Sequence, residues 1–265
     1  MKLSVLKALV LTSCLGLAAT APAQLLWSSY DSVGTLVDAN AGSGSTVSFN
    51  VPAGTTRFFV TKNFVPLNLS APNTISTVNF TFEASGGLTG TASGLRNMGW
   101  GLYNTAGTAS LADDAGLWTR FNYGNYPETM RHNSGLANLF SGSQLGQGGA
   151  YSGSPVDQTT YNALIRLRSD GAGTGVALGG GSALGSAGVA IQGPGVDQRA
   201  FTNPVTPPPG GYFAFDEFGF MFNNWSGDEI TLTLGSVGLT VVPEPSSFAL
   251  VGLGLLGLLV RRNRN

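Results

Sequence analysis

The sequence has 265 residues, of which only 10% are charged, and it contains 39 glycines, one cysteine and one histidine. Between residues 24 and 242 there are eight Lys and Arg against thirteen Asp and Glu, which gives a net charge of −5. A nucleic-acid-binding protein needs a basic patch to neutralise phosphates, so this class is excluded.

The first 23 residues have the pattern of a secretory signal peptide. Lys2 and Lys7 precede an apolar run at 8–19, and Ala21 and Ala23 occupy the positions that signal peptidase recognises. We therefore expect signal peptidase to cleave after Ala23 and the remaining chain to be exported.

Cys14 lies within this predicted signal. The run LTSC at 11–14 resembles a bacterial lipobox, in which the cysteine would be acylated. That cut would leave a shorter apolar run than signal peptides need, so cleavage after Ala23 is favoured. The mature chain then has no cysteine, and we expect no disulfide, cysteine metal site or thiol nucleophile.

Residues 24–242 are predicted to form one all-β domain, an antiparallel β-sandwich, because domains of this class commonly reach 200–250 residues. Gly, Thr, Ser and Asn are abundant there, whereas the helix formers Glu, Lys and Gln are scarce. Apolar and polar residues alternate with a period of two, which predicts strands with one buried and one solvated face. The clearest alternating stretches are 47–51, 57–61, 77–82, 163–168 and 218–222.

The last part of this domain predicts two further strands. After a polar loop at 223–227, apolar residues alternate at 230–234 and then at 237–241 with the opposite parity. A shift of one residue moves every side chain to the other face, so we expect a bulge or a turn at Gly235-Ser236. The glycine-rich stretch 171–195 fits either a flexible loop or a thin pair of strands, and the proline-rich stretch 203–211 predicts a stiff, extended connector.

Aromatic residues gather among Asn, Gly and Thr between residues 100 and 126. Aromatic rings beside amides and hydroxyls suit stacking on sugars, which gives a candidate carbohydrate-binding set of Trp100, Tyr103, Trp118 and Tyr123. The alternative, which we favour, is that most of these rings fill the core.

No catalytic motif is present. His132 is not accompanied by a nucleophile elbow, and a single histidine cannot anchor a zinc site, so a surface-loop position is expected. Asp216 and Glu217 are adjacent, so in a strand they would point to opposite faces and could not flank one glycosidic bond. Asp113 and Asp114 lie in a predicted loop whose oxygens could hold a structural Ca²⁺, although no calcium motif surrounds them. No other cofactor or metal is expected.

The C-terminal 24 residues combine three features. Pro243, Glu244 and Pro245 come first, an apolar run forms a predicted single transmembrane helix at about 246–260, and a basic tail follows at 261–265. The apolar run is short for a bilayer, but Arg261, Arg262 and Arg264 can extend toward the headgroups and place this end on the cytoplasmic side.

These features at 243–265 resemble the PEP-CTERM sorting signal of exported bacterial proteins from exopolysaccharide producers. The resemblance implies recognition by exosortase, a membrane protease-transpeptidase, with cleavage near Pro-Glu-Pro and release to the cell surface or extracellular matrix. The strand pattern of residues 24–242 resembles the jelly-roll and concanavalin-like sandwiches that are common in proteins with this signal.

We therefore expect an exported precursor anchored in the inner membrane, whose partners are signal peptidase, exosortase and the membrane. The expected role is structural or adhesive in a biofilm or exopolysaccharide, and no enzymatic activity is expected. The alternatives are a carbohydrate-binding module and, less favoured, a polysaccharide-active enzyme.

Overall fold

The computed structural model describes residues 24–61, 63–64, 66–69, 74–86, 98–105, 114–121, 127–132, 143–147, 155–169, 176–178, 188–200, 214–224 and 227–243. The predicted signal peptide at 1–23, the connector at 203–211 and the predicted transmembrane helix with its basic tail lie outside these residues. No helix among the described residues is long and apolar enough to cross a bilayer.

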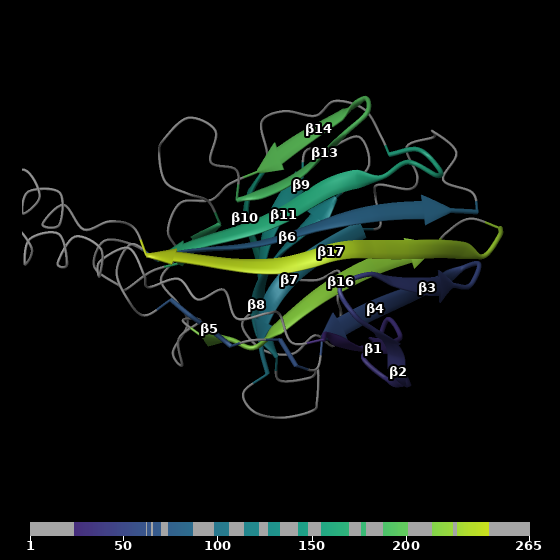
Figure 1. Ribbon diagram of the computed structural model, residues 1–265, viewed down its shortest axis with the longest axis horizontal. Helices are drawn as coiled ribbons and strands as arrows, with labels where there is room; N and C mark the ends of the chain where they lie inside the picture. The colour runs from purple at the N-terminus through teal and green to yellow at the C-terminus, as the bar shows by residue number, and fades with distance from the viewer. Residues whose placement is uncertain are drawn as a thin grey trace, which may run out of the picture.

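Two large antiparallel sheets pack face to face, which confirms the predicted all-β sandwich (Figure 1). The eight-stranded sheet has the order β10 (Ser143–Gln147), β9 (Pro127–His132), β8 (Ala115–Phe121), β7 (Met98–Asn104), β16 (Glu217–Asn224), β4 (Thr55–Thr61), β1 (Leu26–Tyr30) and β2 (Leu36–Ser43).

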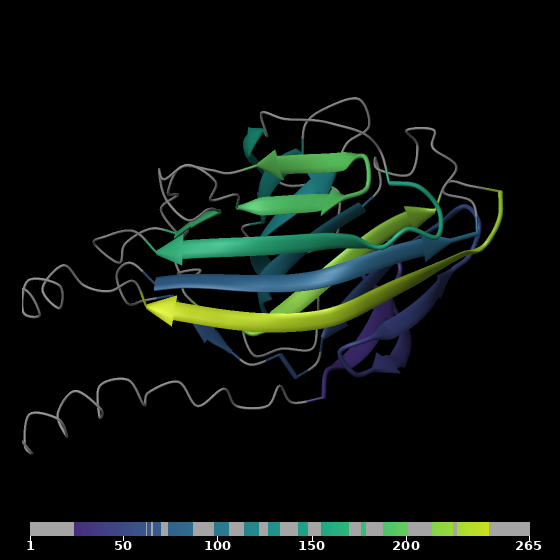
Figure 2. The same cartoon turned by 45° about the horizontal axis from the view of Figure 1, so that its top comes forward.

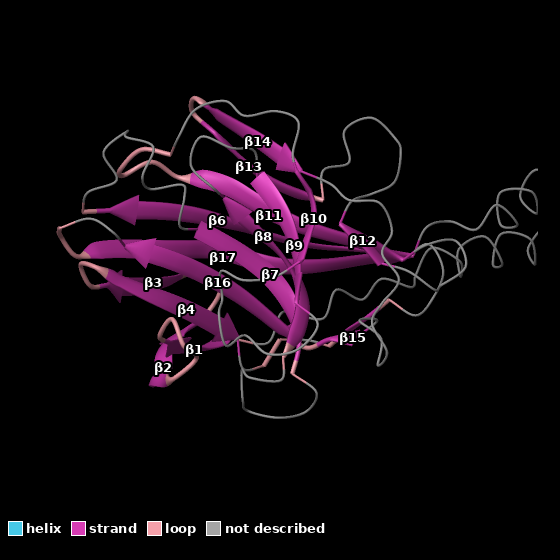
Figure 3. Ribbon diagram, turned by 180° about the vertical axis from the view of Figure 1, so that it is seen from behind, coloured by secondary structure: helices cyan, strands magenta, loops and turns pink. Residues whose placement is uncertain are grey.

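The seven-stranded sheet has the order β14 (Val196–Ala200), β13 (Val189–Gly193), β11 (Tyr161–Ser169), β6 (Thr74–Ser85), β17 (Ile230–Pro243) and β3 (Val47–Val51), with β12 (Val176–Leu178) paired to β11. A small third sheet pairs β15 (Ala214–Phe215) with β5 (Leu67–Asn68). The long strands β11, β6 and β17 run side by side in the seven-stranded sheet, which covers the eight-stranded sheet, as the turned and reversed views show (Figures 2 and 3).

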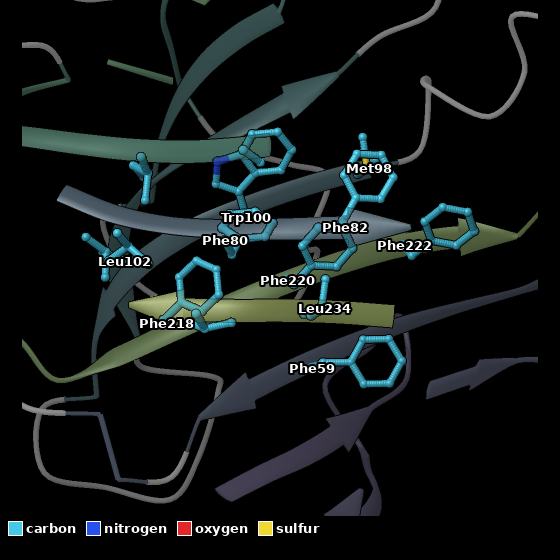
Figure 4. Close-up of a cluster of buried hydrophobic side chains, with 14 of the residues drawn as sticks. Phe59, Phe80, Phe82, Met98, Trp100, Leu102, Phe218, Phe220, Phe222 and Leu234 are labelled. Atoms are coloured by element: carbon cyan, nitrogen blue, oxygen red, sulfur yellow. The ribbon is translucent and has the colours of Figure 1, made fainter. Parts of the chain in front are cut away.

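Aromatic side chains fill the space between the two sheets (Figure 4). Phe80 of β6 meets Trp100 of β7 edge to face, with ring centroids 5.4 Å apart, and it lies 5.4 Å from Phe218 of β16. Trp100 also stacks on Phe220 at 6.2 Å. Because such rings bury large apolar areas and prefer these geometries, they hold the sheets together.

The strands predicted from alternation are all present. In β6 every second residue from Thr74 is buried, as expected for a strand with one covered face. The stretches 230–234 and 237–241 form one continuous strand, β17, with a bulge between Gly235 and Gly238 where Ser236 has φ of 53°. Of the two devices expected at Gly235-Ser236, the chain therefore uses the bulge.

Two local predictions change. The polar residues Asn223 and Asn224 belong to β16 rather than to a loop, and both are buried. The Asn224 amide donates hydrogen bonds to the carbonyls of Val51 (2.7 Å) and Asp228 (2.8 Å), which explains how an amide is accommodated there. The two described strands of the 171–195 stretch, β12 and β13, each pair with β11 instead of with one another.

Candidate functional site

The sorting motif begins within β17, the last strand of the sandwich. β17 continues to Pro243, the first residue of Pro-Glu-Pro, and pairs with β6 as far as Val242 opposite Ile75 and Pro243 opposite Thr74. Figure 1 shows this end of β17 as the yellow arrow tip at the left of the molecule. Glu244 and Pro245 lie outside the described residues, as do the flanking arginines Arg261, Arg262 and Arg264.

The direction of the backbone groups at this end follows from two hydrogen bonds. The Thr74 amide donates to Ser169 Oγ on β11 (2.8 Å), so Thr74 turns its backbone groups away from β17. Arg166 of β11 lies opposite Thr77, and its amide donates to the Gly188 carbonyl beside β13, away from β6. The backbone groups of Thr77 therefore also point away from β11, toward β17. In an antiparallel pair these directions alternate. Pro243, opposite Thr74, therefore points its nitrogen away from β6. For this reason the missing N–H of proline removes no hydrogen bond to β6.

The other edge of β17 is covered over only part of its length. β3 pairs with β17 from Ile230 to Leu234, and the Val237 amide donates to the Ser45 carbonyl (3.2 Å). From Leu239 to Pro243, no described strand pairs with this edge. Among the strands that the structure describes, the segment that leads into the sorting motif thus lies at an edge.

The predicted carbohydrate-stacking set requires correction. Trp100, Tyr103 and Trp118 are 0%, 2% and 1% exposed, so these rings present no face to a sugar. Trp100 points into the sandwich, and its indole N–H donates to the Leu164 carbonyl (3.0 Å). The alternative prediction, that these three rings are buried, is therefore correct. The sequence could not decide between the two, because alternation alone does not tell which face of a sheet becomes covered. Tyr123 lies outside the described residues.

Tyr103 and Trp118 belong to a second, smaller cluster on the face of the eight-stranded sheet opposite the main core. The cluster contains Phe58, Val60, Tyr103, Trp118 and Met221, all nearly fully buried. The Tyr103 ring lies across three glycines, Gly101, Gly116 and Gly219, where an added Cβ would collide with it. Glycine is therefore required at these positions by the close approach of the ring to the backbone.

An acidic pair accompanies this cluster. Glu217 lies directly opposite Tyr103 in the pairing of β16 with β7, so the two share a face, and Glu217 is only 6% exposed. Burial raises the pKa of Glu217 well above its ordinary value, and the nearby charges of Asp114 and Asp216 raise it further. Burial likewise raises the pKa of Tyr103 well above its ordinary value, with smaller contributions from Glu217 and Asp114. Glu217 therefore holds its proton to a higher pH than an exposed glutamate does.

Asp216 and Glu217, which were expected not to flank one bond, have different surroundings. Asp216 accepts hydrogen bonds from the Thr105 amide (2.9 Å) and hydroxyl (2.8 Å), whereas Glu217 is buried and the charge of Asp114 helps to raise its pKa. An acidic residue in the otherwise apolar run 217–222 was the signal available for this buried group. With Asp114 at 1% and Glu217 at 6% exposure, the pair is closed to a substrate in this structure.

The remaining predicted sites have mixed outcomes. His132 is the last residue of β9 and pairs with Gly116 of β8, so it lies in a strand and not in the predicted loop. The described residues contain no group of three or more His, Cys, Asp and Glu that could hold a metal ion. Asp113 lies outside the described residues, as do Cys14, Ala21 and Ala23, so the calcium site and the signal-peptidase site stay predictions.

Comparison with known proteins identifies the tail. Residues 241–264 match the family model of the PEP-CTERM protein-sorting motif, and no curated protein matches the chain.

Several solved β-sandwiches resemble the domain weakly. Lectin II from Ulex europaeus has 10% identity over 83% of this chain and 94% of its own, with a TM-score of 0.42. Arcelin-5, a lectin-like defense protein from Phaseolus vulgaris, has 8% identity over 83% of this chain and 100% of its own, with a TM-score of 0.43. A legume lectin-like domain from Entamoeba histolytica has 9% identity over 83% and 91%, with a TM-score of 0.39. TM-scores below 0.5 assign the chain neither a family nor a function.

Proposed function

We propose that this protein is a structural or adhesive component of an extracellular polymer, delivered there by exosortase. The observation that carries the proposal is the PEP-CTERM protein-sorting motif at residues 241–264. The motif implies an exported precursor that is anchored in the membrane, processed by exosortase and sorted to the cell surface. In this scheme signal peptidase first removes residues 1–23, and the apolar run at about 246–260 holds the domain at the membrane.

The surface of the seven-stranded sheet supports a role among hydrated polymers. Between β3 and β17 its outward side chains are neutral polar groups in contact: Ser48 Oγ lies 2.9 Å from Thr233 Oγ1, and Thr231 Oγ1 donates to Asn50 Oδ1 at 3.1 Å. Hydroxyls and amides both donate and accept hydrogen bonds, which suits contact with the hydroxyls of a neutral polysaccharide. We assign the domain no enzymatic activity, in keeping with the closed Asp114–Glu217 pair.

Carbohydrate recognition at a defined site is the alternative. It would have to use groups other than the faces of Trp100, Tyr103 and Trp118, since these are buried. Binding of one purified glycan with saturation would support it, whereas retention in the matrix without a saturable glycan supports the structural role.

Fractionation with intact-mass measurement, in hosts with and without exosortase, tests the sorting. With exosortase we expect a surface or extracellular product that lacks residues 1–23 and the C-terminal segment beyond the Pro-Glu-Pro region. Without it, the product should keep Arg261–Arg264 and stay in the membrane fraction. An intact C-terminus in the competent host contradicts the proposal. A deletion strain with unaltered matrix cohesion contradicts the structural role alone.

A further inference from the structure

The sorting motif and the sheet share residues. The family model matches from residue 241, while β17 pairs with β6 through Pro243. No spacer therefore separates the folded domain from the motif, and an enzyme that recognises the motif meets the end of the sheet at the same time.

One edge of this shared strand has no described strand beside it from Leu239 to Pro243. By the alternation set by Thr74 and Thr77, the backbone groups of Thr240 and Val242 point to β6. Those of Leu239 and Val241 point to the opposite edge, with which no described strand pairs. Such an edge is a template for a strand from another chain.

We propose that the edge of β17 from Leu239 to Pro243 is the surface on which the sorting protease docks, by adding a strand of its own. This inference rests on the proposed function. Added strands bind through main-chain hydrogen bonds, and β17 is already extended and held by β6, so little conformational freedom is lost on binding. The occupant is the protease because the edge continues directly into the residues that the protease recognises.

Pro243 fixes where this pairing ends. Its nitrogen points to the same edge as the amides of Leu239 and Val241 but carries no hydrogen. The docked strand therefore receives N–H donors from Leu239 and Val241 and only a carbonyl from Pro243. From this point on, the protease recognises the side chains of Pro243, Glu244 and Pro245 instead of pairing with the main chain. The end of the pairing therefore fixes the position of the motif relative to the enzyme.

A spacer insertion tests the coupling of edge and motif. A flexible Gly-Ser segment of about eight residues between Val242 and Pro243 keeps the pairing through Val242 but separates the strand from the motif. We expect exosortase processing in the competent host to slow at least about tenfold, because docking no longer positions the motif. The matched control places the same segment in the turn between β13 and β14 at Gly195, where a Cβ would meet nothing within 4 Å, and should be processed like the wild type. Unchanged or faster processing of the Val242–Pro243 insertion, with normal thermal unfolding, overturns the inference.

Hydrogen exchange gives a second, independent measurement. With an exosortase variant that lacks its active-site cysteine, the amides of Leu239 and Val241 should become protected, whereas those of Thr240 and Val242 are already protected by β6. Protection of Leu239 and Val241 that rises with protein concentration in the absence of exosortase would show that a second copy covers the edge, and would overturn the inference. A wild-type chain that the competent host leaves unprocessed refutes the sorting function itself, which distinguishes that failure from this one.

Discussion

Glu217 and Tyr103 lie directly opposite each other in the pairing of β16 with β7, so a carboxyl and a phenol share one buried face of the eight-stranded sheet. The Tyr103 ring lies over the glycines of three strands, so close that an added Cβ would collide with it. Burial, together with Asp114 and Asp216, raises the pKa of Glu217 well above its ordinary value of 4.5. The folded protein therefore holds a proton on Glu217 up to a higher pH than the unfolded chain does.

The pH dependence of stability follows from this proton. The contribution of Glu217 is fully present below about pH 4.5, the ordinary pKa. It is lost as the pH rises toward the higher pKa of the folded state, by at most about 1.4 kcal/mol per pH unit. Glu217→Gln keeps the shape but cannot ionise, so its free energy of unfolding should exceed that of the wild type at pH 7.5 and approach it near pH 4.5. Urea unfolding of both proteins at pH 4.5, 6.0 and 7.5 measures the difference, and a constant difference across this range contradicts the assignment.

Trp100→Ala should destabilise the sandwich strongly. Trp100 is fully buried between Phe80 and Phe220 and donates a hydrogen bond to the Leu164 carbonyl, so its loss leaves a cavity and removes this hydrogen bond. We expect a loss of about 3–5 kcal/mol in the free energy of unfolding. The exposed Val33→Ala serves as control and should change it by less than about 0.5 kcal/mol. A Trp100→Ala protein of normal stability that loses binding to a polysaccharide would restore the ring as a recognition residue.

Gly219→Ala tests the contact between the Tyr103 ring and the sheet. A Cβ at this position would lie 2.7 Å from Phe58 Cζ and 2.9 Å from Tyr103 Cε2, so one ring must move. A loss of about 1–3 kcal/mol is expected from such overpacking. Gly227→Ala is the matched control, since its Cβ meets nothing within 4 Å. Thermal unfolding of the two variants should show a lower Tm for Gly219→Ala only. Equal Tm values would contradict a close contact between the Tyr103 ring and Gly219.

Asn224→Ala should loosen the connection between the two sheets. Its amide joins the end of β3, at Val51, to Asp228 just before β17. Removal leaves the buried Val51 carbonyl without this donor, which costs about 1–3 kcal/mol. Asn50→Ala, on the exposed face of β3, should cost less than about 0.5 kcal/mol. Chemical denaturation compares the pair, and a neutral Asn224→Ala would show that water satisfies these carbonyls.

Period-two alternation was sufficient to predict the long strands, because the side chains of a strand alternate between faces whatever lies beside it. The opposite parities at 230–234 and 237–241 also predicted the irregularity that appears as the bulge in β17. The pairing of Glu217 with Asp114 could not be predicted. These residues are about a hundred positions apart, and only the adjacency of β8, β7 and β16 brings them together.

The sequence by itself determined the all-β class, the low content of basic residues and the C-terminal sorting motif, since periodicity, composition and a contiguous motif are properties of the chain alone. The tertiary structure decided that Trp100, Tyr103 and Trp118 are buried, and that β17 keeps β6 on one edge while β3 leaves the other edge at Leu234. Both depend on which strands become neighbours. A local pattern specifies the faces and edges of a strand, and long-range pairing decides what covers them.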